Sequence, residues 1–300
     1  MHWQTTRFDI DLTRPKVMGI VNVTPDSFSD GAQHAAPNEA LAHAQQLLRE
    51  GADLLDIGGE STRPGAVPLS AHEELARLMP VVQEVVHWNV PISIDTYKPE
   101  VMQAVLDAGA DIINDVWALR WRSGPAGLAG QDVIARHPRC GVCLMHMHGE
   151  PRTMQLSPMT GDVLAQVGAF LSEEVQHLRA LGVASERIAL DPGIGFGKTV
   201  AQNFDLLARQ SELLALGYPL LVGWSRKSSL AQVAALPGGV ACPPGQHERM
   251  VPSVAAALLA VTRGASMVRV HDVKETVQAL KVLDAIKHHP QQRDNMTGTA

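Results

Sequence analysis

The sequence is poor in several kinds of residue, and each shortage excludes a class of protein. Cysteine occurs only three times in 300 residues. An odd and low number of cysteines argues against a disulfide framework and fits a reducing compartment, so we expect a cytoplasmic protein. Aromatic residues make up only 4% of the chain. The core must therefore be built from Ala, Val, Leu and Ile, which suits helices packed on a buried parallel sheet.

Long apolar runs and an excess of basic residues are also missing. The longest apolar stretch, Val254 to Val261, is too short to span a bilayer and predicts a buried helix. Residues Met1 to Asp9 are too polar for a signal peptide. The net charge is −6, without the basic stripe of a nucleic-acid surface. We therefore expect neither a membrane nor a nucleic acid as a partner.

Short runs rich in Val, Ile and Leu recur along the chain, and each ends in or beside a polar residue. Their hydrophobicity is nearly continuous rather than alternating, which is typical of strands covered on both faces. With 45% hydrophobic and 19% charged residues, the chain can bury a full-size core. The eight runs are Val17–Asn22, Asp53–Asp56, Pro91–Asp95, Asp111–Asn114, Val142–His146, Ile188–Asp191, Pro219–Gly223 and Met267–His271.

Helical patterns lie between these runs. Ser70 and Glu73 form a predicted capping box, and Pro99 stands at a predicted first turn. The predicted helices are Asn38–Glu50, Ser70–Val86, Pro99–Ala108, Asp162–Leu181, Val200–Leu216, Val251–Arg263 and Val273–His288. Repeated alternation of strand and helix predicts an α/β protein with a single (β/α)8 TIM barrel over residues 1–290. Residues 291–300 are predicted to be a flexible tail, and the Gly- and Pro-rich segments 120–131 and 236–246 to be surface loops.

Polar residues stand at the carboxyl ends of the predicted strands, where barrels carry their active sites. Any one of them could merely cap a helix, but the whole ring favours a ligand that is rich in N–H donors, such as a fused pteridine ring. The ring consists of Asn22, Asp56, Asp95, Asn114, His146, Asp191, Ser225 and His271.

Basic residues converge on the same predicted rim and indicate an anion site, although Arg226 alone could be a solvated helix start. They are Arg63, Arg226, Lys227, Arg269 and His271.

Two further patterns imitate known sites. The segment from Cys140 to His148 resembles a metal-ligand cluster, but Cys140 and Cys143 should point to opposite faces of a strand. The segment from Gly193 to Thr199 imitates a phosphate-binding loop, but Pro192 stands where the Walker spacing requires glycine. We predict neither a metal cluster nor a nucleotide loop there.

Five segments together resemble the signature motifs of the dihydropteroate synthases. The resemblance runs from about Lys16 to Leu283, and each segment falls at a predicted strand end. The segments are Asn22–Gly31, Asp56–Gly65, Asp191–Lys198, Gly223–Ser228 and Val268–Val273. The resemblance implies synthesis of dihydropteroate from a dihydropterin diphosphate and 4-aminobenzoate, with Mg2+, in a homodimer.

The resemblance also implies a division of roles among residues. Catalysis would fall to Asp95, Lys227 and Arg63. The pterin would be bound by Asp95, Asn114, Asp191, Lys227, Met145 and Gly223. The diphosphate would be bound by Asn22, Thr62, Arg63, Arg269 and His271, and Asn22 would also bind Mg2+. The site for 4-aminobenzoate, which sulfonamides also occupy in the family, would be shaped by Thr62, Arg63, Pro64, Phe196 and Ser228.

A dissociative reaction follows from the weak nucleophilicity of an aromatic amine: the diphosphate should leave first, and Asp95 should stabilise the resulting cation. Two alternatives are a methyltetrahydrofolate methyltransferase and a degenerate paralogue that only binds pterin. The first does not need the diphosphate loops or Lys227 followed by Ser228. The second should have lost some of Asn22, Thr62, Arg63, Asp95 and Lys227, and all five are present.

Overall fold

The computed structural model describes residues 1–23, 32–61, 67–124, 127–150, 153–235 and 249–288. The predicted loop 236–246 and the predicted tail 291–300 lie outside these residues.

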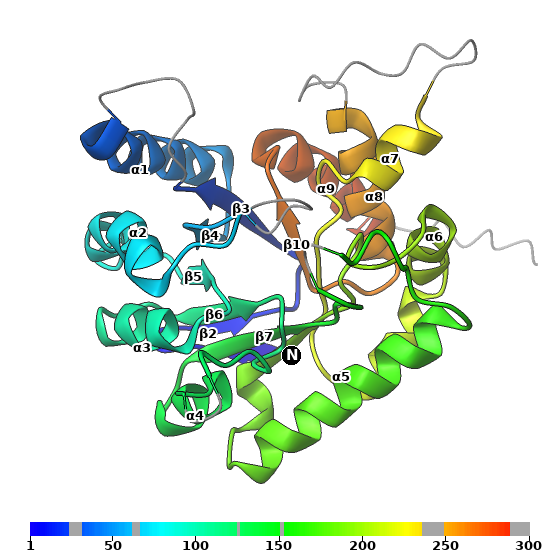
Figure 1. The fold of residues 1–300 in the computed structure, drawn as a ribbon. Coiled ribbons are helices and arrows are strands. Elements are labelled where there is room, and N and C mark those ends of the chain that lie inside the picture. The colour runs from blue at the N-terminus through cyan, green and yellow to red at the C-terminus, as the bar shows by residue number, and fades with distance from the viewer. Residues whose placement is uncertain (24–31, 62–66, 125–126, 151–152, 236–248, 289–300) are drawn as a thin grey trace, which may run out of the picture.

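Eight parallel strands form the centre of the molecule, with helices around them (Figure 1). They are β3 (Lys16–Asn22), β4 (Leu54–Gly58), β5 (Ile92–Asp95), β6 (Ile112–Asp115), β7 (Gly141–Met145), β8 (Ile188–Asp191), β9 (Leu221–Val222) and β10 (Met267–Val270). Their hydrogen-bonded order is β8-β7-β6-β5-β4-β3-β10-β9. A parallel bridge between Leu190 and Leu220 joins the two outer strands. All eight predicted runs are therefore strands, and the predicted (β/α)8 barrel is confirmed.

The helices are α1 (Ala32–Glu50), α2 (Ala71–Val85), α3 (Pro99–Asp107), α4 (Gly130–Arg136), α5 (Val163–Ala180), α6 (Val200–Ala208), α7 (Ser228–Val233), α8 (Met250–Thr262) and α9 (Val273–His288). The predicted capping box of Ser70 and Glu73 is present at the start of α2. Helix α1 begins six residues before its predicted start at Asn38. Helix α4 begins at Gly130, inside the segment that was predicted to be a loop.

One predicted helix, Val200–Leu216, is divided in the structure. Helix α6 ends at Ala208, and a 3-10 helix follows over Gln210–Leu216. The amide of Gln210 is buried and donates to the carbonyl oxygens of Ala260 and Arg263. The Gln210 side chain thus supplies hydrogen-bond donors to backbone carbonyl groups at the carboxyl end of α8, which lack partners within that helix. Helical periodicity in the sequence does not reveal this interaction.

Alternation of side chains along the strands creates two separate apolar clusters. Residues that point into the barrel, such as Met18 and Leu54, form an inner cluster, whereas Val17 and Leu55 pack outward against the helices. Cys143 belongs to the inner cluster, while Cys140 belongs to the outer one, and both are free thiols. The prediction that these two cysteines face opposite ways is confirmed.

A hairpin that the sequence analysis missed covers the amino-terminal end of the barrel. It consists of β1 (His2–Gln4) and β2 (Asp9–Asp11), paired antiparallel. Trp3 and Ile10 join the inner apolar cluster, and the indole N–H of Trp3 donates to the carbonyl oxygen of Arg187 at 2.9 Å. The hairpin therefore plugs the bottom of the barrel.

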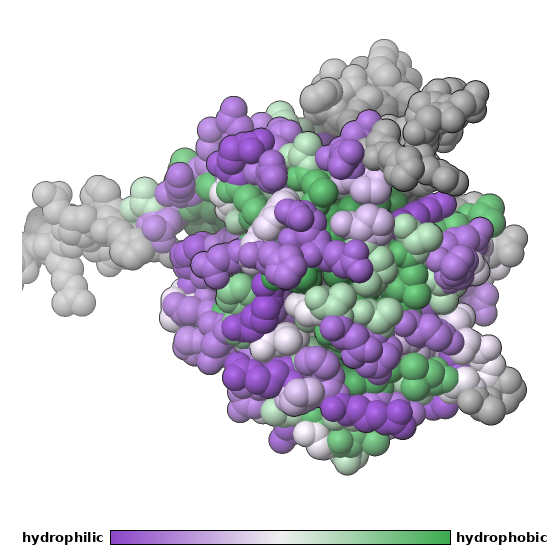
Figure 2. Space-filling view, turned by 90° about the vertical axis from the view of Figure 1, so that its left-hand side faces the viewer, coloured by the Kyte–Doolittle hydropathy of each residue, from purple (hydrophilic) through white to green (hydrophobic). Residues whose placement is uncertain are grey.

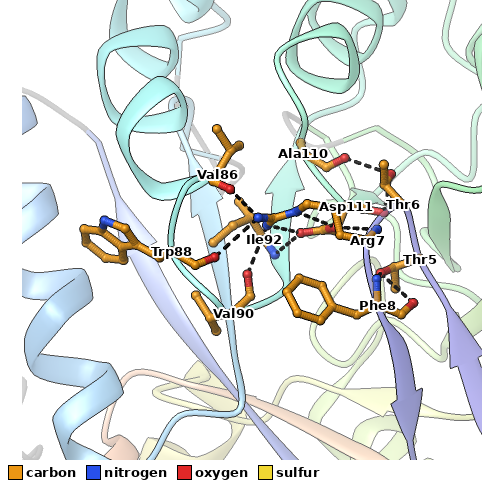
Figure 3. A network of polar contacts seen from close by, with 10 residues as sticks. All are labelled: Thr5, Thr6, Arg7, Phe8, Val86, Trp88, Val90, Ile92, Ala110 and Asp111. Atoms are coloured by element: carbon orange, nitrogen blue, oxygen red, sulfur yellow. Dashed lines mark hydrogen bonds and ion pairs between the residues drawn. The ribbon is translucent and has the colours of Figure 1, made fainter.

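Arg7, in the turn of this hairpin, ties it to the barrel wall (Figure 3). Its Nη2 lies 2.6 Å from Oδ2 of the buried Asp111 and 3.1 Å from the carbonyl oxygen of Val90. Its Nη1 donates to the carbonyl oxygens of Val86 and Trp88. One guanidinium thus serves a buried carboxylate and the chain between α2 and β5.

The face over α1 to α3 carries mainly hydrophilic residues, with hydrophobic ones in small groups (Figure 2). Among the described residues, no helix has the length and apolar character needed to cross a membrane.

Candidate active site

A cavity of about 560 Å3 opens at the carboxyl ends of the barrel strands. Its lining combines carboxylates, amides and cations with a few apolar side chains. The lining residues are Ile20, Asn22, Glu60, Ser61, Asp95, Asn114, Val116, Met145, Met154, Gln155, Asp191, Ile194, Gly195, Phe196, Gly223, Ser225, Arg226, Lys227, Ser228, Arg249, Arg269 and His271.

The structure brings the predicted substrate residues together around this cavity wherever it describes them. The predicted residues in its lining are Asn22, Asp95, Asn114, Met145, Asp191, Phe196, Gly223, Lys227, Ser228, Arg269 and His271. Thr62, Arg63 and Pro64 lie outside the described residues. Two members of the predicted polar ring, Asp56 and His146, do not line the cavity and are buried behind it.

Asp56 lies beneath the cavity floor and organises it. Its side chain is fully buried, accepts a hydrogen bond from Ser93 Oγ at 2.6 Å and lies 2.5 Å from Nε of Arg269. Arg269 also reaches Asp95, whose Oδ2 is 2.7 Å from Nη2. One guanidinium thus bridges two carboxylates, and this fixes the planes of both.

Burial raises the pKa of Asp95 to about 7, with a further rise caused by nearby Asp56 and a reduction caused by Arg269. The Asp95 carboxyl group can therefore exist in both protonation states near neutral pH. The pKa of Arg269 is raised by its two carboxylates in spite of burial, so this residue stays charged.

Asn114 and Asp191 are held so that each presents an acceptor. The amide nitrogen of Asn114 donates to Asp56 Oδ2 at 3.3 Å, which leaves the amide oxygen as the acceptor of that side chain. Oδ1 of Asp191 accepts from the backbone N–H of Gly193 at 2.7 Å, which fixes the carboxylate and leaves Oδ2 for a ligand. Burial raises the pKa of Asp191.

Apolar side chains also line the cavity. Met145 and Met154 belong to a cluster against which Phe196 packs. The ammonium of Lys227 lies 4.3 Å from the centre of the Phe196 ring, close enough for a cation–π contact. Apolar side chains and hydrogen-bonding groups together in one cavity suit a planar polar heterocycle.

The predicted cation cluster is only partly directed into the cavity. His271 contacts Ser225 twice, through Nδ1 at 3.0 Å and through a backbone N–H that donates to Ser225 Oγ at 3.1 Å. Arg226 has a left-handed backbone with φ of 58°, and its guanidinium grips Asp272 through two hydrogen bonds. Much of the charge of Arg226 is therefore balanced within the protein, which fits a structural role better than an anion site.

Two features of the cavity wall escaped the sequence analysis. Arg249 lines the rim and donates to the carbonyl oxygen of Arg226 at 3.2 Å. Glu60 lines the wall and forms an ion pair with the buried Lys98, which also binds Glu74. The sequence signal for Glu60 was its place in the Asp56–Gly65 segment, but Lys98 and Glu74 lie on other elements.

The donor set near Asn22 suits a magnesium ion that is held mainly by its substrate. Asn22 offers one amide oxygen at the cavity rim. Among the described residues, no three His, Cys, Asp or Glu side chains converge as metal ligands. Mg2+ prefers oxygen ligands, keeps several waters and often takes the rest of its ligands from phosphates. One protein oxygen beside a diphosphate is consistent with that habit.

Comparison with known proteins identifies the family. A family profile described as Pterin binding enzyme matches residues 18–271. The curated dihydropteroate synthase of Neisseria meningitidis serogroup C is 49% identical over 287 residues, which are 95% of this chain and 97% of that protein. The chain belongs to the dihydropteroate synthases of the pterin-binding family. It is therefore an enzyme of that kind, and the resemblance of the five segments is confirmed.

Solved structures show the same fold. The dihydropteroate synthase of Burkholderia cenocepacia, complexed with 7,8-dihydropteroate, is 48% identical with a TM-score of 0.84, over 97% of this chain and 98% of that chain. The enzyme of Xanthomonas albilineans with 4-aminobenzoic acid is 45% identical with a TM-score of 0.84, over 97% of this chain and 100% of that chain.

Proposed function

We propose that this enzyme condenses (7,8-dihydropterin-6-yl)methyl diphosphate with 4-aminobenzoate to give 7,8-dihydropteroate and diphosphate in folate biosynthesis. The observation that carries the proposal is the juxtaposition, in one cavity, of the acceptors Asp95, Asn114 and Asp191 with the cations Lys227 and Arg269. The 7,8-dihydropteroate bound by the Burkholderia enzyme combines both substrate halves.

The pterin ring would lie against the acceptors. The amide oxygen of Asn114 and Oδ2 of Asp191 would accept from its amino group and ring N–H, while Lys227 would donate to its carbonyl oxygen. Met145 would cover one face of the ring. At Gly223 an added Cβ would meet no atom closer than 4.0 Å, so the missing side chain leaves space there for the ring.

The diphosphate would lie at the rim, against Arg269, His271, Thr62 and Arg63. Asn22 would hold Mg2+, which would neutralise part of the diphosphate charge. Arg269 binds two carboxylates through Nε and Nη2, so it would meet the anion with the rest of its planar guanidinium.

The reaction would be dissociative, with no covalent enzyme intermediate. Rupture of the C–O bond to the diphosphate leaves a methylene cation conjugated to the pterin. The ionised carboxylate of Asp95, 13% exposed and oriented by Arg269, would stabilise that cation, because a fixed charge acts strongly in a water-poor site. The amine of 4-aminobenzoate would then attack the methylene carbon and release a proton.

The second substrate would bind nearer the mouth. Phe196 and Ser228 line the cavity, and Thr62, Arg63 and Pro64 would complete the site. Since sulfonamides resemble 4-aminobenzoate, we expect them to compete with it here.

We also propose that the enzyme is a cytoplasmic homodimer. Helices α8 and α9 pack against each other, and both leave large apolar side chains exposed. These are Val251 and Leu259 on α8 and Val282 and Ile286 on α9. Exposed apolar residues on adjacent helices are typical of a surface that a second subunit covers.

The test is to follow diphosphate release and dihydropteroate formation from the two substrates with Mg2+. We expect turnover that EDTA abolishes and that a sulfonamide inhibits competitively with 4-aminobenzoate. Lys227→Met should abolish it, whereas Lys281→Met, a change at an exposed lysine of α9, should not. Transfer of a methyl group from methyltetrahydrofolate, or pterin binding without turnover, would instead favour one of the two alternative functions. A pterin–protein adduct trapped during turnover would refute the dissociative route.

A further inference from the structure

The segment that follows β8 contains a buried cation that the proposed reaction does not use. The side chain of Lys198 is almost entirely buried, at 3% exposure, and does not line the cavity. Its ammonium lies 2.9 Å from Nδ1 of His146 and donates to the carbonyl oxygens of Gly193 at 2.9 Å and Phe196 at 3.1 Å. A buried lysine normally pairs with a carboxylate. Within the described part of the chain, no salt bridge joins Lys198 to one.

The surroundings of Lys198 need a donor of this kind. Gly193 approaches His146 so closely that an added Cβ would lie 1.8 Å from the His146 carbonyl oxygen. This packing brings the carbonyl oxygens of Gly193, Phe196 and His146 around one point, and all three are within 3.4 Å of the ammonium. Carbonyl dipoles that converge in a dry interior repel each other unless a donor satisfies them.

The residues that Lys198 holds lead directly to the cavity. The carbonyl of Gly193 accepts from Lys198, and the N–H of the same residue donates to the Asp191 carboxylate. The carbonyl of Phe196 also accepts from Lys198, while its ring contacts Lys227 in the cavity. The Lys198 ammonium is thus hydrogen-bonded to the backbone of Gly193, which holds the proposed pterin-binding residue Asp191. It is also hydrogen-bonded to the backbone of Phe196, a proposed 4-aminobenzoate-binding residue.

We propose that Lys198 is a positioning residue that fixes Asp191 and Phe196 relative to each other, so that the pterin and 4-aminobenzoate sites are set at the spacing of the product. This inference rests on the proposed function, which assigns Asp191 to the pterin site and Phe196 to the 4-aminobenzoate site. His146 acts with Lys198 as its fourth acceptor: burial and Lys198 lower the pKa of this histidine to about 3, so the ring is neutral, and Nδ1 accepts in the tautomer that carries its proton on Nε2. The pKa of Lys198 is itself lowered to about 7 by burial, although nearby Asp191 partly opposes this.

Arg187 offers a matched control at the opposite end of β8. It is also a buried cation, at 4% exposure, and it donates to the carbonyl oxygens of Cys140 and Ile134. Both Lys198→Met and Arg187→Met remove a buried cation from backbone carbonyls. Only Lys198 is connected to the cavity, so only its loss should change substrate affinity.

The experiment compares wild type, Lys198→Met and Arg187→Met by melting temperature, by the KM of each substrate and by the Kd of 7,8-dihydropteroate. We expect both variants to melt at lower temperature. Lys198→Met should raise the product Kd and both KM values about tenfold or more, and Arg187→Met should change them less than twofold. If Lys198→Met binds product as wild type does, or if Arg187→Met weakens binding equally, the proposal is wrong.

Two further measurements keep the test decisive. If Lys198→Met does not fold, Lys198→Gln replaces it with the same direction of effect, because its amide has two N–H donors and no charge. Hydrogen exchange without ligand should show the amides of Gly193, Gly195 and Phe196 protected in the wild type and less protected in Lys198→Met or Lys198→Gln; equal protection in wild type and variant would overturn the proposal. A wild-type enzyme that makes no dihydropteroate would refute the proposed function alone, because the exchange measurement still tests Lys198.

Discussion

The two ends of the barrel are built from the same strands but differ in chemistry. At the amino-terminal end, inward-facing residues such as Met18 and Leu54 are apolar, and the β1–β2 hairpin covers them. At the carboxyl end, Asp95, Asn114 and Asp191 are polar and line a cavity. The residues of the covered end do not line the cavity, so they can contribute to stability alone. The open end can therefore keep charged groups that serve function at a cost in stability.

The largest expected effect comes from the open end. Asp95→Asn removes the carboxylate that would stabilise the methylene cation, while Arg269 keeps its contact with Asp56. We expect kcat/KM to fall roughly 1,000-fold or more with little change in melting temperature, because the substitution is nearly isosteric and removes a buried charge. Asp9→Asn, on the exposed strand β2, should leave both unchanged. Activity close to wild type would contradict the role of Asp95.

A change of shape at the same end should have the next largest effect. Gly223→Val would place a side chain in the space left for the pterin ring, where an added Cβ meets no close neighbour. We expect pterin affinity to fall roughly 100-fold, while stability changes by less than about 1 kcal/mol. Gly168→Ala on α5, where a Cβ would make an ordinary contact at 3.6 Å, serves as the control. Isothermal titration and thermal melting separate the two quantities.

The covered end should show the reverse pattern. Arg7→Met removes the cation that binds buried Asp111 and the carbonyls before β5 (Figure 3). We expect the free energy of unfolding to fall by about 2 kcal/mol, because a buried carboxylate loses charged hydrogen bonds. Both KM values should stay within twofold of wild type.

Arg14 provides the comparison for Arg7. It pairs with Asp53 nearby, but its side chain is 63% exposed, so Arg14→Met should cost less than about 1 kcal/mol. Denaturant unfolding measures both variants. Should Arg7→Met impair substrate binding as strongly as stability, the two ends would not be independent.

The last prediction concerns pH. Burial raises the pKa of Asp95 to about 7, so the ionised form that the proposed mechanism requires is lost as pH falls below that value. We expect kcat/KM to decrease about tenfold per pH unit below roughly pH 6.5, with Asp95→Asn lacking this limb. Stability should move the other way. Between the ordinary pKa of 3.8 and about 7 the folded form holds a proton that the unfolded chain has lost, so stability decreases as pH rises through that range. A flat profile from pH 5 to 8 would contradict the assignment.

The sequence predicted the barrel well because its strands are continuous apolar runs with polar ends. It also predicted most of the cavity, since strand ends share one edge of a parallel barrel: Asp95, Asn114 and Asp191 come together as expected. It failed at the β1–β2 hairpin, whose strands have only three residues each and include polar ones. Such short strands are stabilised by their contacts with the barrel that they cover. A local sequence pattern does not show these long-range contacts.

The depth of a polar residue was equally hidden. Asp56 and Asp95 both stand near strand ends, but only Asp95 reaches the cavity, because Asp56 lies two residues before the end of β4 and binds Arg269 below it. Lys198 stood in the Asp191–Lys198 segment and in a false phosphate-binding pattern, but neither assigned it a role. Its partner His146 is 52 residues away in sequence, and their meeting depends on how β7 and β8 end side by side.

The hairpin has a consequence for the order in which the chain folds. Thr6 bonds to Ala110, 104 residues later, and Trp3 bonds to Arg187, 184 residues later. A ribosome delivers residues 2–11 first, yet their docking site is incomplete until β8 has emerged. Contacts between residues so distant in sequence carry a large loss of loop-closure entropy. We therefore expect the amino-terminal hairpin to be among the last elements to reach its native position.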